Sequence, residues 1–161
     1  MSDAKNTGPD EFDDPLENYE PKQYDDPLEQ ALVEEEVGNI RHEPYTTIPP
    51  DTPIHQAVDK LAGLHIACIL VVDKDRLVGV LSDRDVLTKV ALQYDTVKDC
   101  PVENVMTPDP IFVYETDSAV NTLSVMATCG IRHVPVVDLN DNPVGIVSPQ
   151  RVQEFLQKHY K

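Results

Sequence analysis

The stretch GVLSDRD contains the residues of this chain best suited to ligand chemistry: Gly79, Ser82 and Asp85. Ser82 followed three residues later by an acidic side chain is typical of a helix capping box, in which both side chains satisfy backbone N–H groups of the first turn. The same arrangement also suits a nucleotide, because a helix start attracts phosphate and a carboxylate can accept from both hydroxyls of a ribose. On the first interpretation Gly79 only gives a strand room to pack. The stretch therefore predicts either a nucleotide site or a helix cap alone.

The frame returns later in the chain as GIVSPQR, where Ser148 takes the place of Ser82 and Arg151 the place of Asp85. Ser148 keeps the cap position, and Pro149 suits the first helical position. Arg151 removes the ribose acceptor and puts a cation near the positive end of a helix. Arg151 then either turns to solvent or to an acidic neighbour, or it holds a phosphate. We favour a degenerate second site.

An internal repeat predicts the elements that position both frames. Residues 38–73 align with residues 103–138 without a gap, and each copy reads as β-α-β-β-α. This predicts an α/β (α+β) fold of two pseudo-twofold related repeats in one module, residues 37–98 and 99–161, each covering the apolar face of the other. The expected extended segments are 45–48 and 111–114, and the expected helical apolar residues are Ile54, Val58, Leu61 and Ala62 in the first copy and Val120, Leu123, Met126 and Ala127 in the second.

Over about residues 37–161 the chain resembles a tandem pair of cystathionine-β-synthase (CBS) domains, a Bateman module. The resemblance rests on VMTPDPIFVYETDSAV, GIRHVPVVD, PVGIVS and LVGVLSDRD in this order in a duplicated sequence. It implies that Gly–x–x–Ser/Thr–x–x–Asp is a nucleotide signature, with the hydroxyl toward phosphate and the Asp on ribose. It also implies that the motif of one half faces the leading segment and the second strand of the other half.

Carried over by position, the resemblance assigns two sets of site residues. For the first site it implies that Ile131 lies against a base and that Arg132 and His133 reach phosphates. The alternative for these two is a solvated charge and a half-buried ring. The full first set is Gly79, Ser82, Asp85, Thr107, Asp109, Ile111, Ile131, Arg132 and His133. The degenerate second set is His42, Pro44, Ile66, Cys68, Ser148 and Arg151.

The function that the resemblance implies is a regulatory module that binds AMP, ADP or ATP between two CBS domains and signals through dimerisation or a partner protein. S-adenosylmethionine and a dinucleotide stay open as ligands, and the alternative is a ligand-free protein-interaction module. We expect a homodimer, no required cofactor and no enzyme, since the sequence offers no Ser–His–Asp set, no P-loop Lys and no metal triad.

Composition narrows the partners further. The net charge is −16, and residues 1–36 hold 13 acidic side chains against 2 Lys. Nucleic acid and anionic membranes both need concentrated positive charge, so we expect neither. The longest apolar run, 66–72, is too short to cross a bilayer and nothing near the start is typical of a signal peptide, so we expect a soluble cytoplasmic protein. Three scattered cysteines and five dispersed histidines predict reduced thiols and no metal site.

The acidic segment 1–36 is expected to be disordered or extended, because it has few apolar residues and high charge. It nevertheless carries a duplicated motif, FDDPLENYEPKQ at 12–23 and YDDPLEQALVEE at 24–35. Each DPLE can begin a helix, with Asp as N-cap and Pro at the first helical position. The segment is either a solubilising tail or a docking motif that lays Phe12, Leu16, Tyr24 and Leu28 on a partner or on the body.

Overall fold

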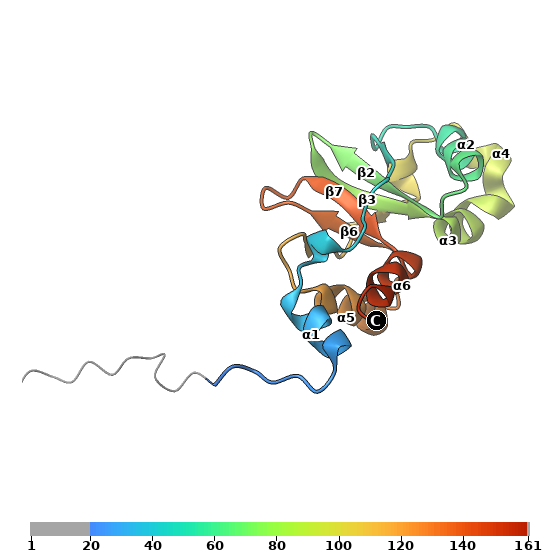
Figure 1. The fold of residues 1–161 in the computed structure, drawn as a ribbon. Coiled ribbons are helices and arrows are strands. Elements are labelled where there is room, and N and C mark those ends of the chain that lie inside the picture. Colours follow the sequence, from blue (N-terminus) through green and yellow to red (C-terminus); the bar gives the residue numbers. More distant parts are fainter. Residues whose placement is uncertain (1–19, 161) are drawn as a thin grey trace, which may run out of the picture.

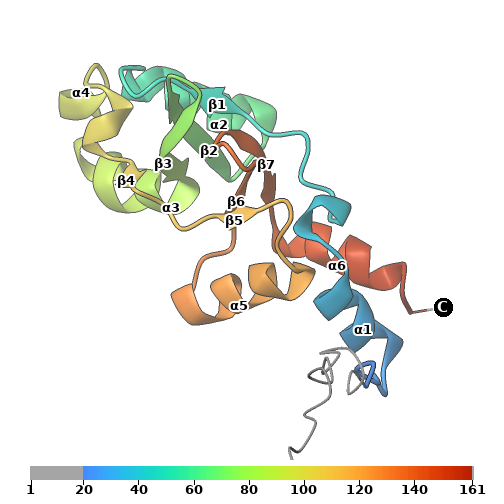
Figure 2. The same ribbon diagram turned by 90° about the vertical axis from the view of Figure 1, so that its left-hand side faces the viewer.

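The computed structural model describes residues 20–160 and consists of two small sheets that lie face to face with helices on their outer sides (Figures 1 and 2). We call the first sheet and its helices the first half, and the second sheet and its helices the second half. The first sheet has the order β1 (Thr47–Ile48), β2 (Cys68–Asp73), β3 (Arg76–Ser82), β4 (Thr107–Pro108), and the second the order β5 (Val113–Tyr114), β6 (Val134–Val137), β7 (Pro143–Val147). The helices are α2 (Ile54–Leu64), α3 (Asp83–Asp85) and α4 (Tyr94–Val97) in the first half, and α1 (Pro27–Glu34), α5 (Ala119–Cys129) and α6 (Pro149–Gln157) in the second.

Both halves follow the predicted β-α-β-β-α order, so the predicted fold class is confirmed. In each half the leading strand runs parallel to the second strand, and the second strand runs antiparallel to the third. The long helix of each half ends at equivalent positions, His65 and Gly130, both in the left-handed conformation. A residue with positive φ is a common helix stop, and glycine adopts it most easily. The last helix of the first half is irregular, since α3 continues into a π-helical turn, Val86–Val90, and a 3-10 turn, Ala91–Gln93.

The two halves exchange short segments, so the packing units differ from the repeat units. Val102 and Val105, which open the second repeat, are buried in the core of the first half. Val37 and Ile40, which open the first repeat, are buried in the core of the second half. Strand β4 carries this exchange into the first sheet by pairing with β3. Neither half therefore completes its core with its own repeat.

A third cluster joins the two sheets. Cys68, Leu70 and Ile146 are buried together between the sheets, and Tyr45 packs against them. The Tyr45 hydroxyl also donates to the carbonyl oxygen of Pro143 in the second half at 3.1 Å. This contact surface makes one module of the two halves, as the repeat predicted.

For residues 27–34, helix α1 corrects the expectation that the acidic segment is disordered or extended. Its start follows the DPLE prediction: Asp26 is the N-cap, its side chain accepts from the N–H of Leu28 at 2.8 Å, and Pro27 lies in the first turn. Tyr24 and Leu28 are half-buried. The first copy of the motif, with Phe12 and Leu16, lies almost wholly outside the described residues.

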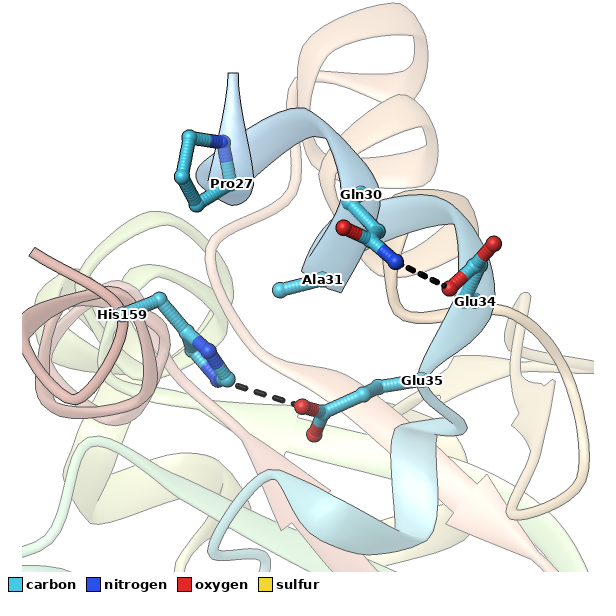
Figure 3. Close-up of a pocket in the computed structure, with 6 residues that line it drawn as sticks. All are labelled: Pro27, Gln30, Ala31, Glu34, Glu35 and His159. Carbon is cyan, nitrogen blue, oxygen red and sulfur yellow. Dashed lines mark hydrogen bonds and ion pairs between the residues drawn. The ribbon is translucent and has the colours of Figure 1, made fainter. Parts of the chain in front are cut away.

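Packing on the second half explains why α1 forms. Ala31 is only 6% exposed in the core of that half, and the Ser118 hydroxyl donates to the carbonyl oxygens of Leu32 and Val33 at 2.9 and 2.7 Å. An isolated helix of eight residues is unstable in water, so these contacts with α5 stabilise it. Between α1 and the end of α6 lies a hollow of about 250 Å³, across which His159 contacts Glu35 at 3.3 Å (Figure 3). The hollow is lined by Pro27, Gln30, Ala31, Glu34, Glu35 and His159.

Candidate functional site

The Asp85 carboxylate is the centre of the first predicted site, and it is 7% exposed. It lies in the first helical turn after β3 and forms the predicted capping box with Ser82. Its Oδ2 accepts from the Ser82 hydroxyl at 2.7 Å and from the Ser82 N–H at 2.9 Å. In return the Ser82 Oγ accepts from the Asp85 N–H at 3.2 Å. The structure thus confirms that Ser82 and Asp85 of GVLSDRD form a helix capping box.

The other oxygen of Asp85 faces two further donors. Its Oδ1 accepts from the Lys89 ammonium at 2.8 Å and from the Thr107 hydroxyl at 3.1 Å. Lys89 lies one turn further along the same helix, whereas Thr107 begins β4 and belongs to the second repeat. The carboxylate therefore lies at the junction of the two repeats, as the resemblance implied for Asp85 and Thr107.

Hydrogen bonding keeps Asp85 ionised despite its burial. Removal from water on its own raises the pKa of a carboxyl group. For Asp85 this is outweighed by the hydrogen bond from Lys89, the two from Ser82 and the positive charge of Lys89, so its pKa lies below the ordinary value. Asp85 is accordingly a carboxylate at neutral pH.

Gly79 has a packing role in this structure. A Cβ at this position would clash with the sulfur atom of Met106, a residue of the second repeat. Pro108, two residues further on, is the register partner of Gly79 in the strand pair. The glycine therefore permits the close approach of the exchanged segment, which was the packing interpretation of Gly79.

The remaining residues of the first set have other surroundings. Asp109 is exposed with a positive φ of 45°, and its N–H donates to the carbonyl oxygen of Val78. Ile111 and Arg132 are exposed, and Ile131 is half-buried against the second core. Among residues 20–160, no hydrogen bond or ion pair joins any of these residues to Asp85.

His133 is half-buried, and its surroundings oppose protonation. Burial lowers its pKa, and the charges of Arg132 and Arg151 lower it further, while Asp83 acts in the opposite direction. A neutral imidazole donates from only one ring nitrogen. The expectation that His133 donates to phosphate as a cation is therefore disfavoured near neutral pH.

At the second frame, Arg151 makes backbone contacts that the sequence interpretation did not predict. Its guanidinium donates to two backbone carbonyl oxygens, that of Ile146 at 2.5 Å and that of Pro44 at 2.6 Å. Ile146 lies in β7, and Pro44 lies in the leading segment of the first repeat. The side chain thus joins β7 to the leading segment of the first repeat.

The residues around Arg151 also pack against one another. A Cβ at Gly145 would lie 2.6 Å from the carbonyl oxygen of His42, and this oxygen accepts from the N–H of Ile146 at 2.9 Å. Ser148 stands at the N-cap of α6, but its side chain makes no cap hydrogen bond. The cap predicted for Ser148 is wrong in this respect, since Arg151 offers no acceptor that would orient the hydroxyl as Asp85 orients Ser82.

The last two residues of the second set are apolar in character. Ile66 packs against the core of the first half. Cys68 is buried between the sheets, where burial together with the charges of Asp85 and Asp83 raises the pKa of its thiol to about 12. Neither offers a group to an anionic ligand.

Lys89 and Met106 are the site residues that the sequence interpretation missed. The spacing of four residues between Asp85 and Lys89 was a usable signal, because such pairs share one face of a helix. Met106 gave no comparable signal, since its position over Gly79 depends on the exchange of segments. Among residues 20–160, no helix is long and apolar enough to span a membrane, and no three His, Cys, Asp or Glu side chains are grouped to hold a metal ion.

Comparison with known proteins identifies the family. The CBS domain family model matches residues 37–92 and 102–158. A CBS domain-containing protein of Arabidopsis thaliana is 34% identical over 106 residues, which are 65% of this chain and 20% of the relative. The chain thus spans only about a fifth of the length of the first curated relatives that it matches.

Two solved structures show the same fold with bound ligands. The CBS domain pair of the protein MJ0100, in complex with 5′-methylthioadenosine and S-adenosyl-L-methionine, has a TM-score of 0.67 and 26% identity, and the match covers 77% of this chain and 97% of that one. A CBS domain protein of Pyrobaculum aerophilum complexed with AMP has a TM-score of 0.66 and 24% identity, with 77% and 99% covered, and at this identity the likeness concerns the fold. With both repeats matched by the family and the fold shared with CBS pairs, this chain belongs to the CBS domain family and contains two CBS domains.

Proposed function

We propose that this chain is a regulatory module that binds the adenosine part of an adenine nucleotide at Asp85, between its two CBS domains. One observation carries the proposal: a buried carboxylate lies at the junction of the two repeats and is bonded to a side chain from each. A carboxylate in this place can accept from both hydroxyls of a ribose. The ligands named for the two similar structures, AMP, 5′-methylthioadenosine and S-adenosylmethionine, all contain an adenosine group with this diol.

The neighbouring residues fit specific parts of such a ligand. Ile131 is half-buried and offers an apolar surface to a base, and Arg132 is exposed and offers a cation to phosphate. The second frame binds no nucleotide on this proposal, because Arg151 already bonds two backbone carbonyl groups. One ligand per chain follows.

A thermal-shift and calorimetry panel with AMP, ADP, ATP, S-adenosylmethionine and NAD tests the proposal. A ligand at a hundredfold its dissociation constant stabilises by about 2.7 kcal/mol, which is a rise in melting temperature of roughly 5 to 10 °C for a chain of this size. The panel is run on the wild type, on Asp85→Asn and on Asp75→Asn, a control with the same change of charge in an exposed turn of the same half. Binding that survives in Asp75→Asn and is lost in Asp85→Asn supports the site, whereas binding that survives in both contradicts it.

The alternative is a ligand-free protein-interaction module, and one observation favours it. Both Asp85 oxygens already have two donors each within the chain. If the carboxylate serves only to cap the helix and join the repeats, no compound of the panel binds, and Asp85→Asn only lowers the melting temperature.

We further propose that the module is a cytoplasmic homodimer that signals through a partner protein. Exposed leucines on the first half, Leu64, Leu87 and Leu92, offer apolar surface for such contacts. Light scattering at several protein concentrations measures the oligomeric state, and a monomer at all of them would refute the dimer.

A further inference from the structure

Lys89 makes three contacts that join the Asp85 site to the leading segment of the second repeat. Besides Asp85, its ammonium group donates to the carbonyl oxygens of Val105 at 3.0 Å and Met106 at 3.5 Å. An ammonium group has three donors, so its hydrogen-bonding capacity is filled. The contacts hold Asp85 and the residues just before β4 in one position.

The contacts of Asp85 divide into a fixed pair and an exchangeable pair. Oδ2 is bonded to Ser82 within its own capping box, and loss of those bonds would uncap the helix. Oδ1 is bonded to Lys89 and Thr107, whose side chains reach solvent: that of Lys89 is 41% exposed, and Thr107 as a residue is exposed. A carboxylate oxygen has two lone-pair directions, so Oδ1 has none to spare. A ribose diol can therefore bind Asp85 only by displacing Lys89 or Thr107 from Oδ1.

We propose that Lys89 is an internal competitor of the ligand: it occupies Asp85 in the empty module, and its displacement by a ribose releases the carbonyl groups of Val105 and Met106. This inference rests on the proposed function, because it concerns the same carboxylate. It makes Lys89 a positioning residue that couples the occupancy of the site to the segment carrying Met106 and β4.

The release reaches the second half through a short path. Met106 lies over Gly79, and the next residue, Thr107, pairs with Val80 in the first sheet. From there the chain runs within a few residues to β5 of the second sheet. Ligand binding thus loosens the segment that joins the two sheets.

Affinity for a neutral ligand tests the competition. Adenosine has the diol but no phosphate, so removing the charge of Lys89 cannot weaken an attraction to phosphate. Removing the competitor in Lys89→Met is expected to tighten adenosine binding about tenfold, as expected when a site blocked about nine-tenths of the time becomes fully available. Lys98→Met is the matched control, because Lys98 lies in the same half and its ammonium group pairs with the exposed Asp95, at 4.0 Å, and not with Asp85.

Calorimetry with adenosine and with AMP on the three proteins separates the outcomes. Tighter adenosine binding in Lys89→Met and an unchanged affinity in Lys98→Met support the competition. Equal or weaker adenosine binding in Lys89→Met, with binding to the wild type intact, overturns it and leaves the nucleotide site standing. If neither the wild type nor Lys89→Met binds any adenine compound, the proposed function itself fails, and the competition fails with it.

Hydrogen exchange of the wild type gives a second test that needs no variant. Saturation with AMP is expected to speed up amide exchange in the segment 102–107, because loss of the Lys89 contacts loosens the backbone whose N–H groups bond the carbonyl oxygens of Pro50, Thr52 and Val102. Amide exchange in this segment that stays unchanged or slows on AMP binding would overturn the release. This measurement also decides the matter if Lys89→Met does not fold.

Discussion

Replacing Asp85 by alanine tests how far the carboxylate stabilises the empty module. The substitution removes the acceptor of four hydrogen bonds at once. The donors left behind differ in their access to water. The N–H of Ser82 lies in a half-buried turn, whereas Lys89 and Thr107 can turn to solvent. The stability lost therefore comes mainly from the capping box.

The expected loss can be estimated from these contacts. Loss of a capping side chain costs about 1 kcal/mol. Lys89 is partly exposed, so its pair with Asp85 contributes less than a fully buried pair, about 1 kcal/mol including the hydrogen bond. We expect a decrease in the free energy of unfolding of about 2 kcal/mol, which lowers the melting temperature by roughly 4 to 8 °C. Among residues 20–160, the side chain of the neighbouring exposed Asp83 bonds only the N–H of Arg84, so Asp83→Ala is expected to cost less than about 0.5 kcal/mol.

The stability difference between the wild type and Asp85→Ala should also depend on pH. The pKa of Asp85 is lower in the folded protein than in the unfolded chain. The Asp85 carboxylate therefore stabilises the fold fully above the unfolded pKa of about 3.9, and this stabilisation is lost as the pH falls through the lower folded pKa. Urea unfolding of the wild type and Asp85→Ala, followed by circular dichroism, should show a constant difference between pH 5 and 8 and a smaller one below about pH 4. A difference under about 0.5 kcal/mol at pH 7, or one that grows in acid, would refute the reasoning.

Three further substitutions or modifications test the packing of the two frames. Gly145→Ala should lower the free energy of unfolding, measured in urea, by about 2 kcal/mol, and by more than Gly79→Ala. The methyl group added at Gly145 would meet the backbone carbonyl oxygen of His42, whereas the one added at Gly79 would meet the movable side chain of Met106. Equal losses in the two variants would contradict this. Arg151→Asp restores the motif residue but removes the donor of two carbonyl groups, so it should lower the free energy of unfolding by about 2 kcal/mol. We expect it to create no second nucleotide site. A calorimetric stoichiometry of two nucleotides per chain would contradict this. The raised pKa of Cys68, about 12, should slow its alkylation at pH 8 at least tenfold relative to the exposed Cys129, and mass spectrometry after iodoacetamide treatment checks this; similar rates would show that Cys68 is not buried.

The local part of the candidate site could be predicted from the sequence. The capping box of Ser82 and Asp85 follows from residue types and spacing, and so does the helix start at Asp26 and Pro27. Both depend on contacts within one helical turn. The pair of Asp85 and Lys89 is equally local, and its spacing of four residues was readable.

The contacts between repeats could be predicted only as a general arrangement. The repeat indicated that the halves share a core, but it did not indicate that Val102 and Val105 change sides. Hydrophobic periodicity reports that a residue is buried and says nothing of which core receives it. Composition likewise misjudged α1, because an acidic segment with few apolar residues folds once another element supplies a surface for its one apolar face.

Asp85 and Arg151, which carry opposite charges at the last position of the two frames, both hold the two repeats together. Asp85 and Arg151 each bond the leading segment of the opposite repeat, Asp85 through the hydroxyl of Thr107 and Arg151 through the carbonyl oxygen of Pro44. Asp85 is an acceptor, and its partners Lys89 and Thr107 can turn away from it and rebond to water, whereas Arg151 is a donor and offers no acceptor to the hydroxyls of a ribose. On the proposed function, the first frame therefore exchanges its internal partners for a ligand, and the second frame joins the repeats without one.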